Sequence, residues 1–284
     1  MADYDTLLKH LISEALKEDI GKGDYSTLCC IPEQQQGKAT LKIKQETILA
    51  GVEVAETIFK YFDPTIQFIA LKKDGEIVKP IQEAFIVKGR IHTILSCERL
   101  VLNCMQRMSG IATLTNQYNT LLHGYHTRLL DTRKTTPNFR IVEKEAVRIG
   151  GGYNHRMGLY DMIMLKDNHI DFCGGVIPAI EKAHQFVQNQ KNKLKIEVEV
   201  RNINELEQVL SIGKIDRIMM DNFTPTQLMQ AVRKINKQFE TEASGGINIY
   251  NIQAYAETGV DFVSVGALIH QAQSIDLSLK AVIM

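Results

Sequence analysis

The sequence lacks the excess of positive charge that a dedicated nucleic-acid-binding protein carries. Its 284 residues include 33 basic and 33 acidic side chains, so the formal net charge is zero. A domain that binds nucleic acid usually has a basic excess gathered on one face. We therefore expect no nucleic-acid partner, and any concentration of charge has to be sought locally.

Long apolar runs are also missing. No stretch reaches the roughly 18 apolar residues that a membrane-crossing helix needs. Residues 1–24 are amphipathic and mixed in charge, without the basic start and unbroken apolar core of a signal peptide. These absences predict a cytoplasmic protein without a membrane partner.

The cysteines form no recognisable metal or disulfide framework. There are five, an odd number, and no two of them are spaced as a CxxC pair. A chain of this length can bury a full core without cross-links, so we expect reduced thiols and no structural zinc site. The composition, 44% hydrophobic and 23% charged, is that of an ordinary globular protein of one or two domains.

The first part of the chain mixes helix and strand patterns irregularly. Residues 4–19 have a helical apolar face, residues 38–44 alternate as a half-buried strand does, and residues 52–62 read as a helix. Short strands are expected at 66–71 and 84–88. A long helix is expected from about 94 to 122, with a possible break at Gly110. This mixture predicts an α+β layer.

After residue 125 short apolar runs alternate with helix patterns. The runs lie at 127–131, 161–165, 195–200, 216–220, 239–243 and 261–265, and the last four start 21 to 23 residues apart. Such strand–helix units form parallel sheets with right-handed crossovers. They could close into a barrel or remain an open doubly wound sheet.

Charged residues or glycines follow the successive strands, which favours the barrel. The residues concerned are Arg133, Lys134, Lys166, Glu199, Asp221, Ser244, Gly245, Gly246 and Gly266. In a parallel β/α barrel the carboxyl ends of all strands open on one face, and that face holds the active site. The pattern therefore predicts that residues far apart in sequence meet at one rim.

Positive charge is concentrated between residues 128 and 156. Seven Lys or Arg residues stand there against three acids. Such a density is repulsive unless an anion compensates it, and guanidinium groups bind carboxylate or phosphate through two parallel hydrogen bonds. A solvated loop remains the simplest reading of Arg133 and Lys134 alone, but the neighbouring His155 and Arg156 favour an anion site.

Glycines and acids supply the other parts of the expected site. Residues 244–246, Ser-Gly-Gly, follow one strand and precede a helix pattern, where backbone amides can point at a phosphate. Residues 150–152, Gly-Gly-Gly, are as well explained by a flexible turn. Glu199 and Asp221 end adjacent strands and suit Mg²⁺ or ribose hydroxyls, although a salt bridge from Lys166 or Arg133 is an open alternative. His169 more simply braces its loop.

Taken together, these motifs resemble a known family. The segments DTRKTTP, GGGYNHRMGL, MLKDNH, EVEV, MDNF, EASGGI and VSVGAL occur in the order and spacing of quinolinate phosphoribosyltransferases. EDIGKGDYST and CERLVLNCMQRMSGIAT, nearer the N-terminus, are also similar to that family. The resemblance covers nearly the whole chain.

The resemblance implies an architecture and a reaction. An α/β sandwich domain, residues 1–112 with residues 276–284 packing back on it, would precede an incomplete, seven-stranded parallel β/α barrel at 113–275. The enzyme would transfer phosphoribosyl from phosphoribosyl pyrophosphate (PRPP) to quinolinate in de novo NAD biosynthesis. The products would be nicotinate mononucleotide, pyrophosphate and CO₂, with Mg²⁺ as cofactor.

It also implies residue roles. Arg133, His155 and Arg156 would bind the quinolinate carboxylates, and Lys134 and Lys166 would face the phosphates. Glu199 and Asp221 would hold ribose hydroxyls and Mg²⁺, directly or through water, and share the catalytic role with the two lysines. The remaining substrate-binding positions would be Thr132, Ser244, Gly245, Gly246, Val265 and Gly266, the glycines around the 5′-phosphate. Arg99 would enter the site of a second subunit, making a homodimer the minimal active unit.

One departure and two alternatives accompany the resemblance. Asn138 stands where family loops often have glycine, and asparagine tolerates left-handed backbone well. A paralogue of the same fold with another acceptor, such as the molybdenum-associated group, would share most motifs. A non-catalytic sensor of phosphate ligands would need the Ser-Gly-Gly segment but not the pair Glu199 and Asp221.

Overall fold

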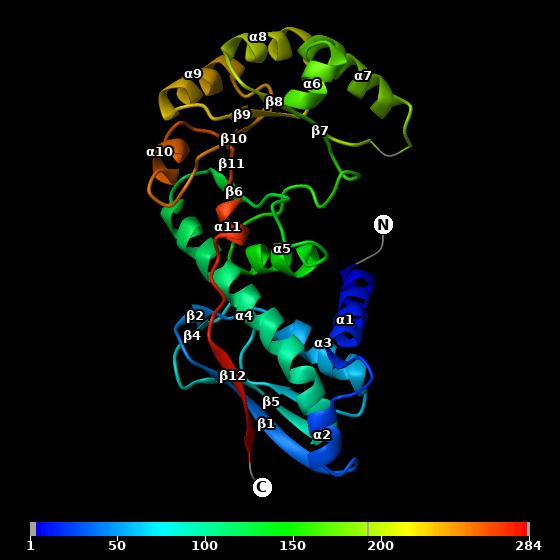
Figure 1. Cartoon of the computed structure of the whole chain (residues 1–284). Helices are drawn as coiled ribbons and strands as arrows, with labels where there is room; N and C mark the ends of the chain where they lie inside the picture. The colour runs from blue at the N-terminus through cyan, green and yellow to red at the C-terminus, as the bar shows by residue number, and fades with distance from the viewer. Residues whose placement is uncertain (1–3, 192, 283–284) are drawn as a thin grey trace. The chain divides into compact units, whose positions relative to one another are not determined.

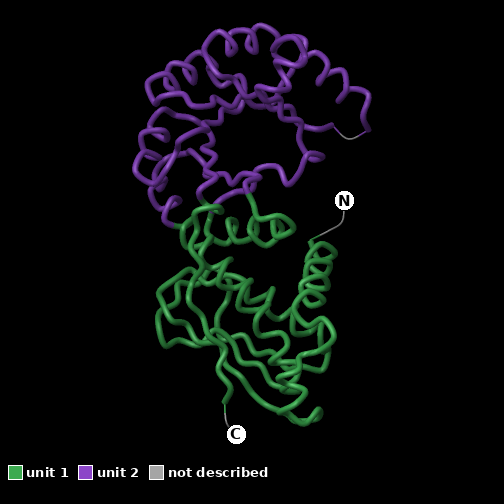
Figure 2. The backbone as a smooth tube through the Cα atoms, viewed as in Figure 1, with its two compact units in different colours: residues 1–116, 135–151, 268–284 green, residues 117–134, 152–267 purple. Residues whose placement is uncertain are grey.

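The structure is a computed structural model that describes residues 4–191 and 193–282. The chain divides into two compact units (Figure 2). Unit 1 comprises residues 1–116, 135–151 and 268–284, and unit 2 comprises residues 117–134 and 152–267. Of the predicted first domain, residues 1–3 and 283–284 lie outside the part that the structure describes.

Unit 1 is built on an antiparallel sheet with the strand order β12-β1-β5-β3 (Figure 1). Its strands are β1 (Gln36–Ile43), β3 (Gln67–Ala70), β5 (Glu83–Arg90) and β12 (Leu277–Val282). The short strands β2 (Thr47–Ile48) and β4 (Ile77–Val78) pair with each other. The C-terminal strand thus lies at the sheet edge beside β1, with Leu41 opposite Leu279.

Helices and aromatic side chains complete unit 1. The helices are α1 (Tyr4–Ile20), α2 (Tyr25–Cys30), α3 (Val52–Phe62), α4 (Ile91–Leu121), α5 (Arg140–Ile149) and α11 (Ala267–His270), with the unit boundary falling inside α4 and α11. Phe59 of α3 lies edge-on to Phe85 of β5, with ring centroids 6.2 Å apart. Phe68 of β3 is 4.6 Å from the same ring. Phe59 and Phe85 are buried, and the three rings together join helix to sheet.

Gly110 does not break α4, contrary to one sequence expectation. The helix continues through it to Leu121. A Cβ at this position would lie 2.0 Å from the carbonyl oxygen of Gln273, so a side chain is excluded by the approach of another segment of unit 1. The glycine is explained by packing, at the cost in helix propensity of about 1 kcal/mol that glycine carries.

Unit 2 is a parallel sheet that curves into an open ring (Figure 2). Its strand order is β6-β11-β10-β9-β8-β7. The strands are β6 (Arg128–Leu130), β7 (Ile163–Leu165), β8 (Ile196–Val200), β9 (Arg217–Asp221), β10 (Glu240–Ser244) and β11 (Phe262–Ser264). Tyr153 forms an isolated parallel bridge to Leu130, in the place of a seventh strand. The predicted incomplete barrel is confirmed, with its seventh strand reduced to this bridge.

Helices follow the strands and cover the outside of the ring (Figure 1). They are α6 (Asp167–Cys173), α7 (Val176–Gln188), α8 (Ile203–Ile212), α9 (Pro225–Ile235) and α10 (Ile252–Ala256). Two begin with side-chain caps: Asn202 accepts from the Glu205 amide, and Thr224 accepts from the Gln227 amide. Because the strands are covered on both faces, all five residues of β8 are buried, including two glutamates. Among the described residues, no helix meets the length and hydropathy needed to span a bilayer.

Candidate active site

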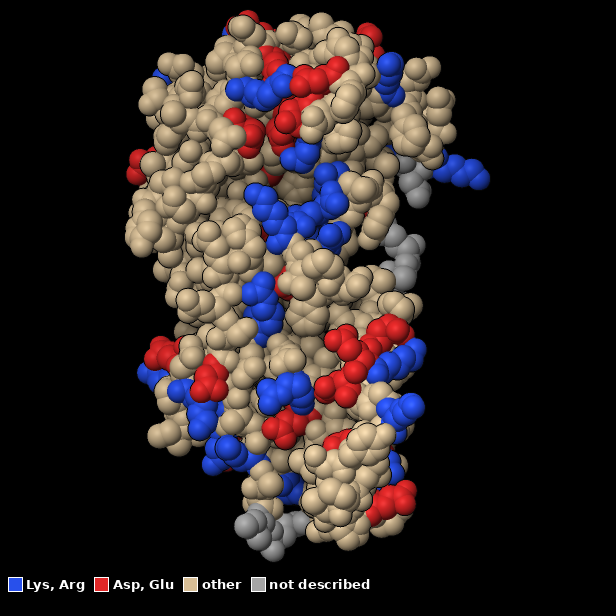
Figure 3. Space-filling view, in the orientation of Figure 1, with Lys and Arg blue, Asp and Glu red and all other residues tan. Residues whose placement is uncertain are grey.

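The carboxyl ends of the unit 2 strands gather most of the predicted site residues. Ser244 of β10 is in register with Asp221 of β9, and the Val265 amide after β11 donates to the Leu130 carbonyl at the end of β6. Figure 3 shows Lys and Arg side chains beside a hollow in the upper part of the view, with acidic side chains nearby. The parallel sheet thus brings both signs of charge to one rim.

Lys166 and Glu199 form an ion pair across neighbouring strands. Lys166 Nζ lies 2.6 Å from Glu199 Oε2. The Glu199 side chain is 9% exposed, whereas that of Lys166 is 43% exposed. The salt bridge left open by the sequence is therefore present, and it leaves the lysine accessible while the acid lies deeper.

Asp221 is held by two neighbours at the end of β9. The Ser244 hydroxyl donates to Asp221 Oδ1 at 2.7 Å, and Asn222 Nδ2 donates to Oδ2 at 2.6 Å. The Ser244 hydroxyl is thus directed at the acid. The carboxylate is consequently fixed in orientation beside the turn that begins at Ser244.

Gly245 and Gly246 both adopt left-handed backbone, with φ of 89° and 67°. A Cβ on Gly245 would lie 2.3 Å from Asn222 Oδ1, whereas one on Gly246 would meet open space. Gly266 comes directly before α11. The turn after β10 therefore needs glycine for two different reasons, conformation at both positions and close approach at the first.

Arg133 carries an unsatisfied polar atom. Its Nε is buried and has no hydrogen-bond partner. Thr132 Oγ1 accepts from the amide of Lys134, which shapes the turn, and Lys134 itself is exposed. A buried guanidinium N–H without a partner is costly in a native protein, so this group is suited to donate to an anionic ligand.

The positive charges of Arg156 and Arg133 are near enough to repel each other. It is 9% exposed, and one guanidinium nitrogen reaches the Met162 carbonyl at 3.4 Å. Burial lowers the pKa of Arg156, and repulsion from Arg133 lowers it further. Two guanidinium groups that repel each other where solvent is largely excluded form a binding site for an anion.

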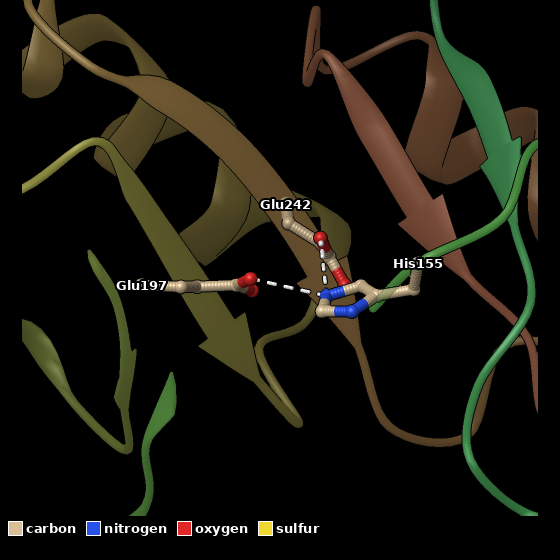
Figure 4. A group of neighbouring side chains, drawn as sticks. All are labelled: His155, Glu197 and Glu242. Carbon is tan, nitrogen blue, oxygen red and sulfur yellow. Dashed lines mark ion pairs between the residues drawn. The ribbon is translucent and has the colours of Figure 1, made fainter. Parts of the chain in front are cut away.

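His155 points into the interior of unit 2 instead of sharing the rim. Its Nε2 lies 3.0 Å from Glu197 Oε2 and 3.4 Å from Glu242 Oε2, between the two carboxylates (Figure 4). Its Nδ1 accepts the backbone N–H of Arg156 at 2.7 Å, and its own amide donates to Asp131 Oδ1 at 2.8 Å. Both ring nitrogens therefore face protein groups, and a direct substrate contact by this ring stays a prediction.

The two glutamates form a buried charged cluster with Arg217. Glu197 and Glu242 are each 0% exposed, and Arg217 of β9 donates to Glu242 at 2.8 Å. Arg217 also lies 4.0 Å above the Phe262 ring. Glu197 and Glu199 are two residues apart on β8 and so share a face, but Glu242 and Arg217 are not predicted from the sequence. The alternation of Glu240, Glu242 and Ser244 was the available signal.

The pKa values of this cluster are shifted together. Burial works to lower the pKa of His155, but the hydrogen bonds and charges of Glu197 and Glu242 outweigh it and raise the pKa to about 9. Burial, reinforced by the charge of Glu242, raises the pKa of Glu197. Both shifts mean that the pair His155–Glu197 retains one proton at neutral pH. Because Nδ1 accepts an N–H, that proton is better placed on Glu197.

Three further predictions have different outcomes. Arg99 lies exposed on the unit 1 part of α4, so its contact with a second subunit stays a prediction. Gly150 caps α5 at its C-terminus, which supports the structural reading of the Gly-Gly-Gly segment. His169 Nδ1 accepts the Lys166 amide at 3.0 Å, which confirms that it braces the loop.

Comparison with known proteins identifies the family. Models of the N-terminal and C-terminal domains of quinolinate phosphoribosyl transferase match residues 24–109 and 111–280. The chain is 40% identical to the chloroplastic nicotinate-nucleotide pyrophosphorylase (carboxylating) of Arabidopsis thaliana, over 98% of this chain and 83% of that protein.

Solved structures agree. The nicotinate-nucleotide pyrophosphorylase of Francisella tularensis has a TM-score of 0.89 at 40% identity, covering 99% of this chain and 98% of its own. That of Ehrlichia chaffeensis has a TM-score of 0.88 at 33% identity, covering 96% and 97%. The chain belongs to the quinolinate phosphoribosyltransferase family.

Proposed function

We propose that the protein transfers a phosphoribosyl group from PRPP to quinolinate with decarboxylation, giving nicotinate mononucleotide, pyrophosphate and CO₂ for NAD biosynthesis. The observation that carries this is the buried, unpartnered Nε of Arg133 close to the buried Arg156. A pyridine dicarboxylate offers these two guanidinium groups the carboxylates they lack. The names of the relatives describe the same reaction.

The basic groups offset the repulsion between the two substrates. Quinolinate and PRPP are both anions, and their approach in water is opposed by repulsion. Arg133 and Arg156 would bind the dicarboxylate, while the accessible Lys134 and Lys166 would face the phosphates. Holding both reactants in line supplies the main catalytic effect, because the entropy lost in bringing them together is lost on binding, before the chemical step.

The acids suit the charge that develops at the ribose. As the bond from C1 to pyrophosphate breaks, positive charge builds on the sugar and negative charge on the leaving group. Glu199 has the sign to stabilise the first, and the lysines have the sign to stabilise the second. The pyridine nitrogen then bonds to C1, and the resulting pyridinium accepts the electron pair that remains when the adjacent carboxylate leaves as CO₂. No covalent enzyme intermediate is required.

The same acids fit Mg²⁺, which we propose as the cofactor. Glu199 and Asp221 are oxygen donors on adjacent strands, the ligand type that this ion prefers. One oxygen of Glu199 is already engaged by Lys166, and both oxygens of Asp221 accept hydrogen bonds. These contacts favour coordination partly through water. Bound there, the ion would neutralise pyrophosphate oxygens.

The turn after β10 fits the 5′-phosphate. Left-handed Gly245 and Gly246, and Gly266 after the next strand, leave backbone close to the ligand without side chains in the way. Val265 lies between β11 and Gly266, and its amide is engaged by Leu130, so it acts through backbone position. Phosphate sites after the last barrel strands recur in this fold class.

We further propose a homodimer in which Arg99 enters the partner's site. Its support is the family's arrangement and the exposure of Arg99. Arg99→Ala and Glu199→Gln should each lose most of their activity alone. Mixing the two should restore activity, since hybrid dimers contain one intact site; no recovery on mixing would contradict a shared site.

The central experiment is release of labelled CO₂ from carboxyl-labelled quinolinate in the presence of PRPP and Mg²⁺. Release that depends on all three supports the proposal. Transfer to another acceptor without CO₂ would identify the paralogue, and binding of PRPP without turnover would identify a sensor. A cytoplasmic location is likewise our proposal; the chloroplast named for the plant relative belongs to that protein, and fractionation of the native host tests it.

A further inference from the structure

The buried cluster of His155, Glu197, Glu242 and Arg217 has no role in the reaction described above. It lies one step along the strands from the rim: Glu197 precedes Glu199 by two residues on β8, and Glu242 precedes Ser244 by two on β10. Because strand side chains alternate, the two residues of each pair point to the same face of the sheet and lie about 7 Å apart along the strand. The cluster therefore forms a layer directly beneath the candidate site.

Burying two carboxylates needs compensation. Arg217 donates to Glu242 at 2.8 Å and so compensates its charge. It also donates to Glu240, the first residue of β10. In the β8–β9 register Arg217 is opposite Glu197. An unpaired buried carboxylate costs several kcal/mol, so a fold keeps such groups only where they are tightly bonded.

A chain of contacts leads from the rim to the carboxylates through the His155 ring. Nε2 of His155 faces Glu197 and Glu242, and Nδ1 accepts the N–H of Arg156. An imidazole nitrogen that accepts a hydrogen bond carries no proton, so the ring proton lies on Nε2 and is donated to the carboxylates. The carboxylates thus select the tautomer that can hold the Arg156 backbone.

We propose that Glu197 and Glu242, braced by Arg217, are positioning residues that fix the orientation and tautomer of His155 and thereby aim Arg156 at the quinolinate carboxylate. The inference rests on the proposed function for its substrate. It does not require any of the three to touch that substrate.

A metal ion is the competing use of the same atoms. His155 Nε2 and one oxygen from each glutamate lie within 4.8 Å of one another, a possible ligand set. Coordination would need Nε2 without its proton, and Nδ1 would then carry one and could not accept from Arg156. The positive charge of Arg217 beside Glu242 also disfavours a cation. The geometry supports hydrogen bonding.

The kinetic test compares two changes at one position. Glu197→Leu removes the acceptor oxygens, while Glu197→Gln keeps one. We expect Leu to raise the KM for quinolinate about tenfold, the effect of losing the contact between one carboxylate and the His155 ring, and to leave the KM for PRPP and kcat nearly unchanged. Gln should recover most of the loss. The matched control is Glu240→Leu, an acid that binds Arg217 without contacting His155. Wild-type KM values in a folded Glu197→Leu protein would overturn the proposal.

A second readout is independent of turnover. Long-range ¹H–¹⁵N NMR of the wild type, with the His155 signal assigned by its loss in His155→Gln, should show a proton on Nε2 and none on Nδ1. A proton on Nδ1, or one equivalent of zinc or manganese retained by the purified protein in native mass spectrometry, would overturn it. Should the wild type fail to make nicotinate mononucleotide, the proposed function fails while this tautomer measurement still decides the hydrogen-bond arrangement.

Discussion

Lys166 Nζ donates to Glu199 Oε2 across 2.6 Å, so the accessible cation and the buried acid of the candidate site act as one unit. Glu199→Gln keeps the shape and an acceptor oxygen but removes the charge. We expect kcat to fall by about 10²- to 10³-fold with small changes in either KM, because the charge matters most when the ribose becomes positive. Steady-state rates with both substrates varied measure this, and an unchanged turnover number would remove Glu199 from the mechanism.

Arg133→Ala and Arg156→Ala should each raise the KM for quinolinate by about 10- to 100-fold, the range for losing a charge-assisted hydrogen bond. The KM for PRPP should change less. Arg148→Ala is the matched control, because Arg148 is exposed and forms an ion pair with its helix neighbour Glu145. Normal quinolinate saturation in both site variants would show that the carboxylates bind elsewhere.

The two glycines after β10 should respond differently to alanine. At Gly245 a Cβ would meet Asn222 at 2.3 Å, whereas at Gly246 only the left-handed conformation resists. We expect Gly245→Ala to raise the KM for PRPP by at least about tenfold, and Gly246→Ala to cost about 1 kcal/mol of stability with a smaller effect on binding. Thermal denaturation separates the two effects. Equal KM values for the two variants would contradict the close approach to Asn222.

Stability should fall as pH rises from about 6.5 to 9. The pKa of His155 is raised from an unfolded value near 6.5 to about 9, and because the ring and Glu197 share this proton, the native His155–Glu197 pair keeps a proton that the unfolded chain releases. This stabilisation is complete below pH 6.5 and is lost through pH 9, at most about 3 kcal/mol. The charged groups that face the ring are Glu197 and Glu242, Arg217 binds Glu242, and the backbone amide of Arg156 donates to Nδ1.

Denaturant unfolding at pH 6, 7.5 and 9 measures the slope. His155→Gln should flatten it, whereas His126→Gln should not, since the His126 side chain is 61% exposed. A wild-type slope that His155→Gln leaves unaltered would show that another group is responsible.

The architecture was predictable because strand spacing and polar strand ends are local properties of the sequence. Apolar runs mark β8, β9 and β10 to within one residue at their starts, and the position of Lys166 after β7 suggested its acidic partner. Asn138, expected to tolerate left-handed backbone, has φ of 61°. Each of these inferences needed only short-range patterns or the common direction of parallel strands.

The rest depends on contacts that no local pattern reveals. The sequence suggests a possible helix break at Gly110, because the group that requires glycine there, the carbonyl of Gln273, is distant in sequence. His155 was placed at the rim beside Arg156, although adjacent residues outside regular structure can point in opposite directions. Its actual neighbours, Glu197 and Glu242, come from β8 and β10, which lie on either side of β9 in the sheet.

The pairing of β12 with β1 has a consequence for synthesis. Residues 36–43 cannot receive this edge partner until residues 277–282 have left the ribosome, so the sheet of unit 1 stays open along one side throughout translation. Shortening the chain before residue 277 would leave that edge permanently uncovered and able to recruit strands from other chains. Final folding of unit 1 thus waits for residues 277–282.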